Sequence, residues 1–185
     1  EIKKIDINKF FNSDTPFVQL LKTELLNNKN LNINTIIKAE QIIPYNDLSN
    51  LELYFKIEEG LFDINKSKFS WLNNVDFQIS NSLLYMKENN LILDGDIMIK
   101  IHDVNEIYKF FQTPRNYRKE IKKITLNFIY NFDQKIISLN NIEIDGSNNE
   151  QVNQLLNQII LKETVLQNRV YIKNLMNKTI KSYAG

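Results

Sequence analysis

Apolar and polar side chains alternate along much of this chain, most clearly between Asn89 and Asp103 in the stretch NNLILDGDIMIKIHD. Consecutive residues of a strand point to opposite faces of a sheet. One face of this stretch would therefore carry Leu91, Leu93, Ile97, Ile99 and Ile101, with Gly95 between them. The other face would carry Asp94, Asp96, Met98, Lys100 and His102. The pattern predicts a sheet with one apolar face and one face in water.

The same alternation predicts further strands that are joined by short polar turns. Together the predicted strands cover 31–43, 50–58, 61–71, 75–80, 82–87, 91–102, 123–132 and 135–145. Strands with such short links pair antiparallel, as a meander. The last two exceed the usual length of about five or six residues, which favours an extended, curved sheet over a small compact barrel. The apolar stripe of 123–132 consists of Ile124, Leu126, Phe128, Tyr130 and Phe132.

Helical signals occur in three places. Thr15 and Pro16 can begin a short helix, and Asp103 with Glu106 forms a capping box for a helix near 104–112. A third helical region begins at about 149, where a stripe predicts a helix that lies on the sheet and buries Leu155 and Ile159. The stripe consists of Val152, Leu155, Leu156, Ile159 and Ile160.

A second apolar stripe follows about 200° around this C-terminal helix. It consists of Val165, Ile172, Leu175, Met176 and Ile180. Either the helix breaks near Glu163 and Thr164, or one long helix buries opposite faces in different places. If the second stripe is exposed, it should form a continuous patch for a membrane or a partner.

These patterns predict a mainly β fold: a curved antiparallel meander with a short inserted helix and C-terminal amphipathic helices. Residues 1–30 would form an N-terminal helical segment, 31–146 the sheet module and 147–185 a C-terminal helical region. With 185 residues, the chain is long enough for one domain with its own core. Because it begins at Glu1, we expect it to be a fragment or a processed product.

Composition excludes several classes of function. The chain has no cysteine, which rules out thiol catalysis, disulfides and zinc–thiolate sites. A net charge of +1 provides no general attraction to nucleic acid or acidic lipid. No apolar run reaches the roughly 20 residues that a membrane-spanning helix needs.

Asp94, Asp96 and His102 share the wet face and raise the question of a metal or acid–base site. Residues 94 and 102 would lie about 26 Å apart along a strand, so one ion cannot bridge them. His102 is the single histidine, which excludes a hydrolytic site built on two histidines. We therefore predict no catalytic residue, no metal site and no cofactor, and a protein that is not an enzyme.

Basic residues gather around Tyr117, where they could contact phosphate groups of lipid or nucleic acid. They are Arg115, Arg118, Lys119, Lys122 and Lys123. A solvated loop, with Glu120 interspersed, is the favoured interpretation. Nucleic acid is not predicted as a partner, because the chain has no glycine-rich phosphate loop and no aromatic pair typical of RNA-binding sheets.

The apolar face of the predicted sheet allows two interpretations, and patterning alone does not separate them. The chain's own helix can close it as an ordinary core, or it can bind lipid. For the lipid-binding interpretation we expect the face to be concave and only partly covered by helix. Its predicted lipid-binding residues are Leu93, Ile97, Ile99, Ile101, Leu126, Phe128 and Tyr130.

The span from about Asn50 to Gly146 resembles the C-terminal region of AsmA-like proteins. The resemblance rests on repeated short amphipathic strands that lead into LLYMKENNLILDGDIMIKIHD. A short helical segment and a strand pair closing in IEIDG, residues 142–146, complete it. The chain lacks the membrane anchor and most of the length of this family, so it would be a terminal module.

Members of that family are Gram-negative envelope proteins, usually anchored in the inner membrane, with a periplasmic body whose curved sheets shelter acyl chains. They are implicated in phospholipid transport to the outer membrane and in envelope integrity. The resemblance implies a periplasmic, non-enzymatic module whose partner is phospholipid or another acyl lipid, with membrane contact through regions outside this chain. The alternative is a scaffold or protein-interaction domain whose apolar face is closed by its own helix.

Overall fold

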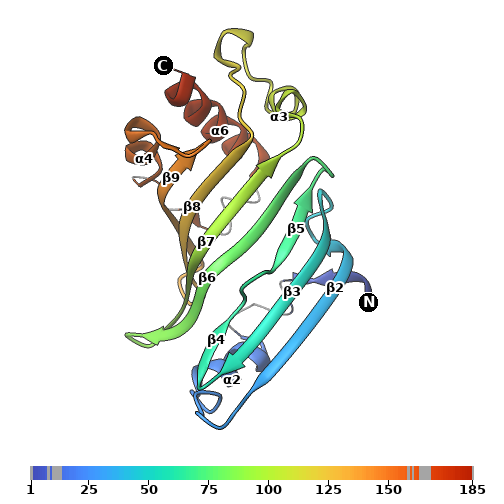
Figure 1. Cartoon of the computed structure of the whole chain (residues 1–185), viewed down its shortest axis with the longest axis vertical. Helices are drawn as coiled ribbons and strands as arrows, with labels where there is room; N and C mark the ends of the chain where they lie inside the picture. The colour runs from blue at the N-terminus through green and yellow to red at the C-terminus, as the bar shows by residue number, and fades with distance from the viewer. Residues whose placement is uncertain are drawn as a thin grey trace.

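The computed structural model describes residues 2–7, 9, 14–157, 159, 161–162 and 168–184. In this part of the chain, eleven strands form one sheet (Figure 1). The strands are β1 (Ile2–Asp6), β2 (Ile33–Ile43), β3 (Leu48–Glu58), β4 (Leu61–Asp63), β5 (Lys68–Trp71), β6 (Val75–Lys87), β7 (Asn90–Ile101), β8 (Lys123–Asn131), β9 (Ile136–Ile144), β10 (Ser147–Asn148) and β11 (Leu161–Lys162). The helices are α2 (Pro16–Lys22), α3 (Val104–Phe111), the 3-10 turn η1 (Arg115–Tyr117), α4 (Glu150–Asn157) and α6 (Arg169–Ala184).

Neighbouring strands follow the order of the chain from β1 to β10, with β4 and β5 both lying between β3 and β6. Every pair is antiparallel except β1 with β2, which is parallel. A parallel pair needs a long crossover, and the segment that contains α2 provides it. The mainly β antiparallel meander with a short inserted helix is therefore confirmed.

The two terminal regions differ from the prediction. The segment 1–30, predicted as helical, also contains β1, whose five residues are too few to show a period in the sequence. The region 147–185 contains the short strands β10 and β11, both paired with β9. Because β11 separates α4 from α6, one long C-terminal helix is excluded. Glu163 and Thr164, the predicted break, lie outside the described residues.

Side-chain hydroxyl groups explain why the predicted strand 61–71 is divided into β4 and β5. The Ser82 hydroxyl accepts a hydrogen bond from the Ile64 N–H at 2.9 Å, and the Ser67 hydroxyl accepts one from the Tyr54 N–H at 3.0 Å. Backbone groups of Ile64 and Tyr54 therefore bond to side chains where a continuous strand would bond to its neighbour. The sequence between 61 and 71 shows no proline or double glycine to mark the interruption.

Predicted strands 75–80 and 82–87 are instead one strand, β6, with a bulge. Ser80 pairs with Asp96 and Leu83 with Asp94, so two residues of β6 lie opposite Gly95. A Cβ on Gly95 would lie 3.0 Å from the Ser82 Cα and 3.1 Å from the Phe128 ring. Glycine at position 95 thus lets the bulge and an aromatic ring approach the same strand.

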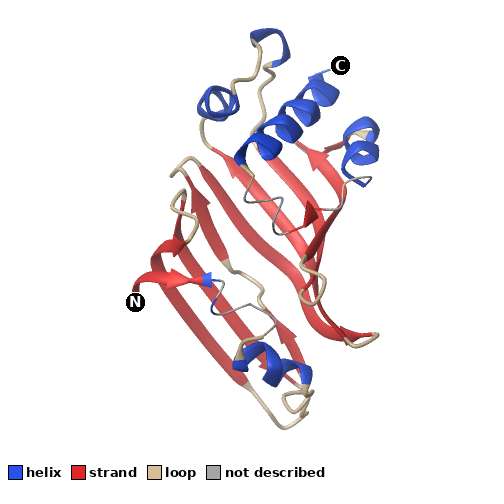
Figure 2. Ribbon diagram, turned by 180° about the vertical axis from the view of Figure 1, so that it is seen from behind, coloured by secondary structure: helices blue, strands red, loops and turns tan. Residues whose placement is uncertain are grey.

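Helices α2 and α6 lie on the same face of the sheet, near its two ends (Figure 2). The Thr15 hydroxyl caps α2 by accepting from the Val18 N–H at 3.3 Å, as predicted. From α2, Phe17 meets Phe55 edge to face at 5.6 Å between ring centres, while Val18 is fully buried. This packing holds α2 over β3 and β4.

Helix α3 is confirmed at the predicted place. Its cap, Asp103, accepts from the Asn105 N–H at 2.9 Å. Glu106 does not complete the capping box with this residue but forms an ion pair with Lys109 at 2.7 Å. Ile107 and Phe111 of α3 are buried with Val75 at one end of the sheet.

The first stripe does not bury the two residues that were predicted to be its buried members. In α4 the fully buried residue is Val152, whereas Leu155 and Ile159 are only half-buried. The chain leaves the helix at Asn157, so Ile159 no longer follows the helical period. The second stripe is not an exposed patch: Ile180 is buried, and Ile172 and Met176 pack against the cluster of Val75, Ile107 and Phe111. Ile160 and Val165 lie outside the described residues.

Candidate functional site: the apolar face of the sheet

The strand register places the seven predicted lipid-binding residues on one face of β7 and β8. Leu93 lies opposite Tyr130, Ile97 opposite Leu126, and Gly95 opposite Phe128. Directly opposed residues of an antiparallel pair project to the same side of the sheet. We call this side the apolar face. Ile99 and Ile101 follow Ile97 by the two-residue period of the same strand.

The apolar face continues across the neighbouring strands as a row of paired apolar residues. In each pair of neighbouring strands from β3 to β9, two apolar residues lie directly opposite each other. No polar residue therefore interrupts the row. Its members, in spatial order, are Ile57, Phe62, Leu84, Leu93, Tyr130 and Ile137. A one-residue slip in any pair would turn a strand's apolar set to the other side, so the row itself helps to fix the register.

Burial divides the seven residues into two groups. Leu93, Leu126 and Phe128 are buried, with less than a tenth of their surface exposed, and they belong to the main core. Ile97, Ile99, Ile101 and Tyr130 are half-buried and pack against the main core, and Ile99 and Ile101 also pack against the cluster of Val75, Ile107 and Phe111. The half-buried group is where a further apolar molecule could make contact.

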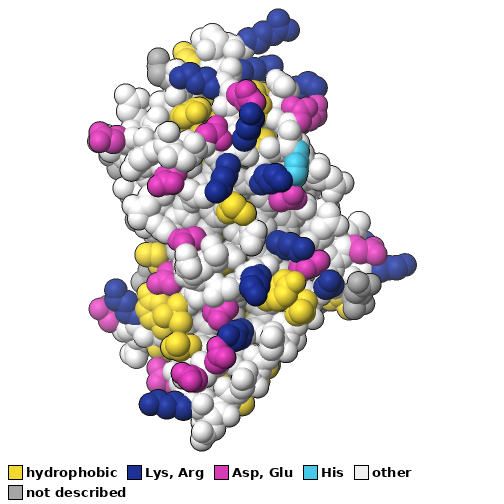
Figure 3. Space-filling model, viewed as in Figure 1, with side chains coloured by type: hydrophobic (Ala, Val, Ile, Leu, Met, Phe, Trp, Pro, Cys, Tyr) yellow, Lys and Arg dark blue, Asp and Glu magenta, His cyan; other side chains and the backbone are white. Residues whose placement is uncertain are grey.

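The opposite face of the sheet is charged. Figure 3 shows lysine and acidic side chains spread over it, with several patches of exposed apolar side chains among them.

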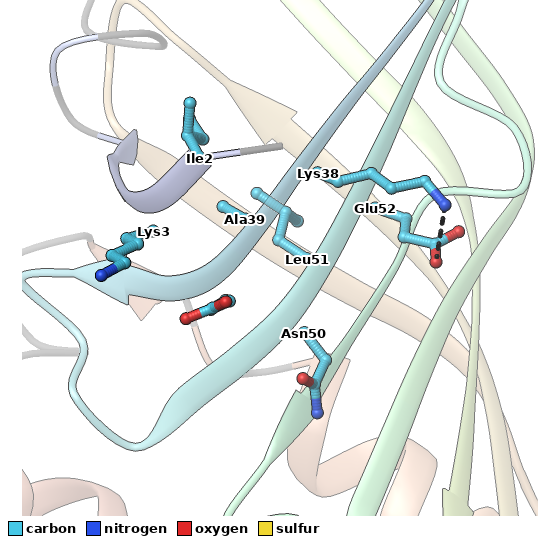
Figure 4. Close-up of a pocket in the computed structure, with 8 residues that line it drawn as sticks. Ile2, Lys3, Lys38, Ala39, Asn50, Leu51 and Glu52 are labelled. Atoms are coloured by element: carbon cyan, nitrogen blue, oxygen red, sulfur yellow. Dashed lines mark hydrogen bonds and ion pairs between the residues drawn. The ribbon is translucent and has the colours of Figure 1, made fainter.

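Two recesses in the described part of the chain are lined by none of the seven residues. The first, of about 300 Å³, lies at the sheet edge formed by β1, β2 and β3 (Figure 4). In it, Glu52 pairs with Lys38 at 3.4 Å and with Lys68 at 3.2 Å. The Lys68 bond does most to lower the pKa of Glu52, against partial burial, which raises it. Glu52 and its lysine partners therefore stay charged in this recess, which makes it unsuitable for an acyl chain.

The acidic and histidine residues predicted to share the wet face do not meet in one site. His102 Nε2 lies 2.7 Å from Asp76 Oδ2, and this hydrogen bond does most to hold the pKa of Asp76 below its ordinary value. Asp96 accepts from Asn81 at 2.6 Å and from the Asn127 amide. In the described ranges, no group of three or more histidine, cysteine or acidic residues could hold a metal ion.

The Asp76–His102 pair was not predicted from the sequence. It arises because β6 and β7 pair in a register that sets Val75 opposite Ile101. Pairing the two strands residue by residue from their short turn would miss it by one position, because the bulge in β6 shifts the register between Ser80 and Leu83. Both side chains are about half exposed, so the pair is a hydrogen-bonded pair at the surface.

No protein-family model, no curated protein and no solved structure matches this chain. Within the described ranges, none of the helices combines the length and the apolar character that crossing a membrane requires.

Proposed function

We propose that the protein is a non-enzymatic lipid-binding module whose apolar face contacts acyl chains. One observation carries this proposal: the apolar row crosses six neighbouring strands, from β3 to β9, without a polar interruption, and on the same face Ile97, Ile99, Ile101 and Tyr130 are half-buried. Exposed apolar surface costs about 25 cal/mol per Å². An acyl chain laid across these residues would remove part of that surface from water.

Charge placement supports lipid over a soluble apolar ligand. The face opposite to the apolar face carries many charged side chains, and the recess at the β1–β2–β3 edge keeps its ion pairs. A lipid has the same division, with an acyl part for the apolar face and a polar head that stays in water. The resemblance of residues 50–146 to AsmA-like proteins leads to the same proposal, with a periplasmic location and a role in phospholipid transport or envelope assembly.

The experiment compares phospholipid that co-purifies with the protein and two variants. Ile99→Asp places a charge on the half-buried part of the apolar face, and Met98→Asp places the same charge on the opposite face. Native mass spectrometry counts the bound lipid, and thermal unfolding checks that both variants fold. We expect Ile99→Asp to lose most of the bound lipid, by about tenfold or more, because a buried charge opposes acyl contact, and Met98→Asp to keep it.

The competing interpretation is a scaffold whose apolar face is a closed core. Burial of Leu93, Leu126 and Phe128 beneath the helix side of the sheet favours it for that part of the face. If the folded wild-type protein carries no lipid and takes up none from vesicles, this interpretation replaces the lipid-binding proposal.

A further inference from the structure

Six basic residues come together from two segments that are far apart in the sequence. Three lie in or beside η1, on the loop after α3, and three lie on α6. We call them the basic surface: Arg115, Arg118, Lys119, Lys173, Lys178 and Lys181. Figure 1 places this loop and the end of α6 at the upper end of the molecule.

Hydrogen bonds of polar side chains connect the loop after α3 to helix α6. The Thr113 hydroxyl, which is fully buried, donates to Asn177 Oδ1 at 2.8 Å, and the Asn177 amide donates to the Phe111 carbonyl at 2.8 Å. The Tyr108 hydroxyl donates to the Lys119 carbonyl. The relative positions of the six cations are thus set by hydrogen bonds that anchor both segments.

Acidic residues do not neutralise the basic surface. The sequence of α6 contains no Asp or Glu, and neither does 112–119. Among the described residues, none of the six cations takes part in an ion pair. Glu120, which is interspersed among the basic residues of the sequence, pairs with Lys122 at 3.0 Å.

Four of the cations contact neutral groups, either through hydrogen bonds or through the rings of tyrosines. Arg118 donates to the Thr113 carbonyl at 2.9 Å, Lys119 lies 5.5 Å from the centre of the Tyr183 ring, and Lys181 lies 5.4 Å from that of Tyr117. Lys173 donates to the Gln112 side chain. These contacts orient four of the six side chains, and none of the contacts involves an acidic group.

A recess of about 310 Å³ opens between the loop and α6. It is lined by Gln112, Pro114, Asn174, Asn177, Lys178 and Lys181. Two ammonium groups and no carboxylate face this space, which suits a phosphate group, since phosphate oxygens form strong hydrogen bonds with charged donors.

We propose that the basic surface docks the protein on a membrane by binding phosphate groups of anionic phospholipids. Nucleic acid fits less well: single strands bind through bases stacked on free aromatic rings. Tyr117 and Tyr183 are half-buried, and each already has a lysine over its ring. The inference does not require that acyl chains bind the apolar face, because the two surfaces share no residue.

Vesicle flotation tests this proposal on the full chain. One set of vesicles contains phosphatidylcholine alone, and the other contains phosphatidylcholine and phosphatidylglycerol in equal parts. The wild-type protein should float with the anionic vesicles and not with the neutral ones, and added salt should release it. Removing both recess cations with Lys178→Gln and Lys181→Gln should weaken binding about 25-fold, at about fivefold for each cation.

The matched control removes two exposed lysines at the other end of the sheet, with Lys29→Gln and Lys87→Gln, and should bind as the wild type does. Lys178→Gln alone, at an exposed position without a contact to Tyr117, guards against a folding defect in the double variant. Ile99→Asp should keep full binding to anionic vesicles even if it loses acyl lipid.

Three results would overturn the docking proposal. Equal flotation with neutral and anionic vesicles would show that the phosphate charge plays no part. Equal losses in the recess and control variants would show an effect of net charge alone. Tight binding of single-stranded RNA by a wild-type protein that does not float with anionic vesicles would assign the basic surface to nucleic acid.

Discussion

Asp133 joins three parts of the fold through one carboxylate. It lies in the turn between β8 and β9, forms an ion pair with Lys22 at the end of α2, and accepts from the Leu91 N–H of β7 at 2.9 Å. Partial burial raises its pKa, but the bonds from Lys22 and Leu91 outweigh burial, so the net pKa lies below the ordinary value of 3.8. The charged form is therefore the one that the folded state stabilises.

Replacing Asp133 with Asn should lower the free energy of unfolding by about 1 kcal/mol at neutral pH. Because the folded pKa is depressed, the contribution of Asp133 is present above its unfolded pKa and is lost as pH falls through its folded pKa. The difference between wild type and Asp133→Asn should therefore shrink below pH 3.8.

Urea unfolding at neutral and acid pH measures this difference. Glu40→Gln, which removes a carboxylate from an exposed position of β2, is the control and should change little at either pH. A difference for Asp133→Asn that stays constant into acid would show that the carboxylate charge does not stabilise the fold.

At the scale of elements, the C-terminal edge of the sheet is protected by one side chain of α4. Asn153 Oδ1 accepts from the Ile142 N–H at 2.7 Å, and its amide donates to the Ile142 carbonyl at 2.9 Å. Asn153 thus occupies the place that a neighbouring strand would take beside β9, between the short strands β10 and β11. Unpaired strand edges invite other chains to pair with them.

Asn153→Ala should cost about 2 kcal/mol of stability, because Ile142 is buried and would lose partners for both its backbone groups. It should also promote self-association through the freed edge of β9. Chemical unfolding and size-exclusion chromatography measure the two effects. Gln154→Ala, at an exposed position of the same helix, should show neither. A monomeric Asn153→Ala protein of wild-type stability would show that the edge is protected in another way.

Strong periodicity explains which elements could be predicted from the sequence. Strands β3, β7 and β8 lie within a residue or two of their predicted bounds because one face of each is buried, which imposes a period of two on the side chains. The sequence did not predict that strand 61–71 is divided or that strands 75–80 and 82–87 are joined, because each change depends on a residue of another strand. Ser82 replaces a backbone partner of Ile64, and Gly95 makes room for the bulge in β6. Local sequence contains no sign of such partners.

The same limit applies to the C-terminal helices. The stripe in α4 correctly predicted an amphipathic helix on the sheet but selected Leu155 and Ile159 as its buried residues. Val152, at the first turn, is the residue fully enclosed by the core. Where a helix ends and how it is rotated depend on the sheet beneath it, which periodicity alone does not describe.

At the scale of the whole molecule, the two proposed surfaces have different origins in the sequence. The shared face of the seven apolar residues followed from alternation, and the register of β7 with β8 agrees with it. Only the loop part of the basic surface could be predicted from the sequence, because Lys173, Lys178 and Lys181 are about 60 residues away from the loop that they join. The Thr113–Asn177 hydrogen bond that brings them together is a contact of the folded chain.

The most direct test of the central claim is photo-crosslinking at two adjacent positions of β7. A photoreactive side chain introduced at Ile99 faces the half-buried part of the apolar face, and one at Met98 faces the opposite side. After illumination in the presence of phospholipid vesicles, mass spectrometry identifies any attached lipid. The account predicts lipid attached through its acyl chains at position 99 and none at position 98. Crosslinks from position 99 to the protein's own helices alone, with no lipid, would contradict it and show a closed core.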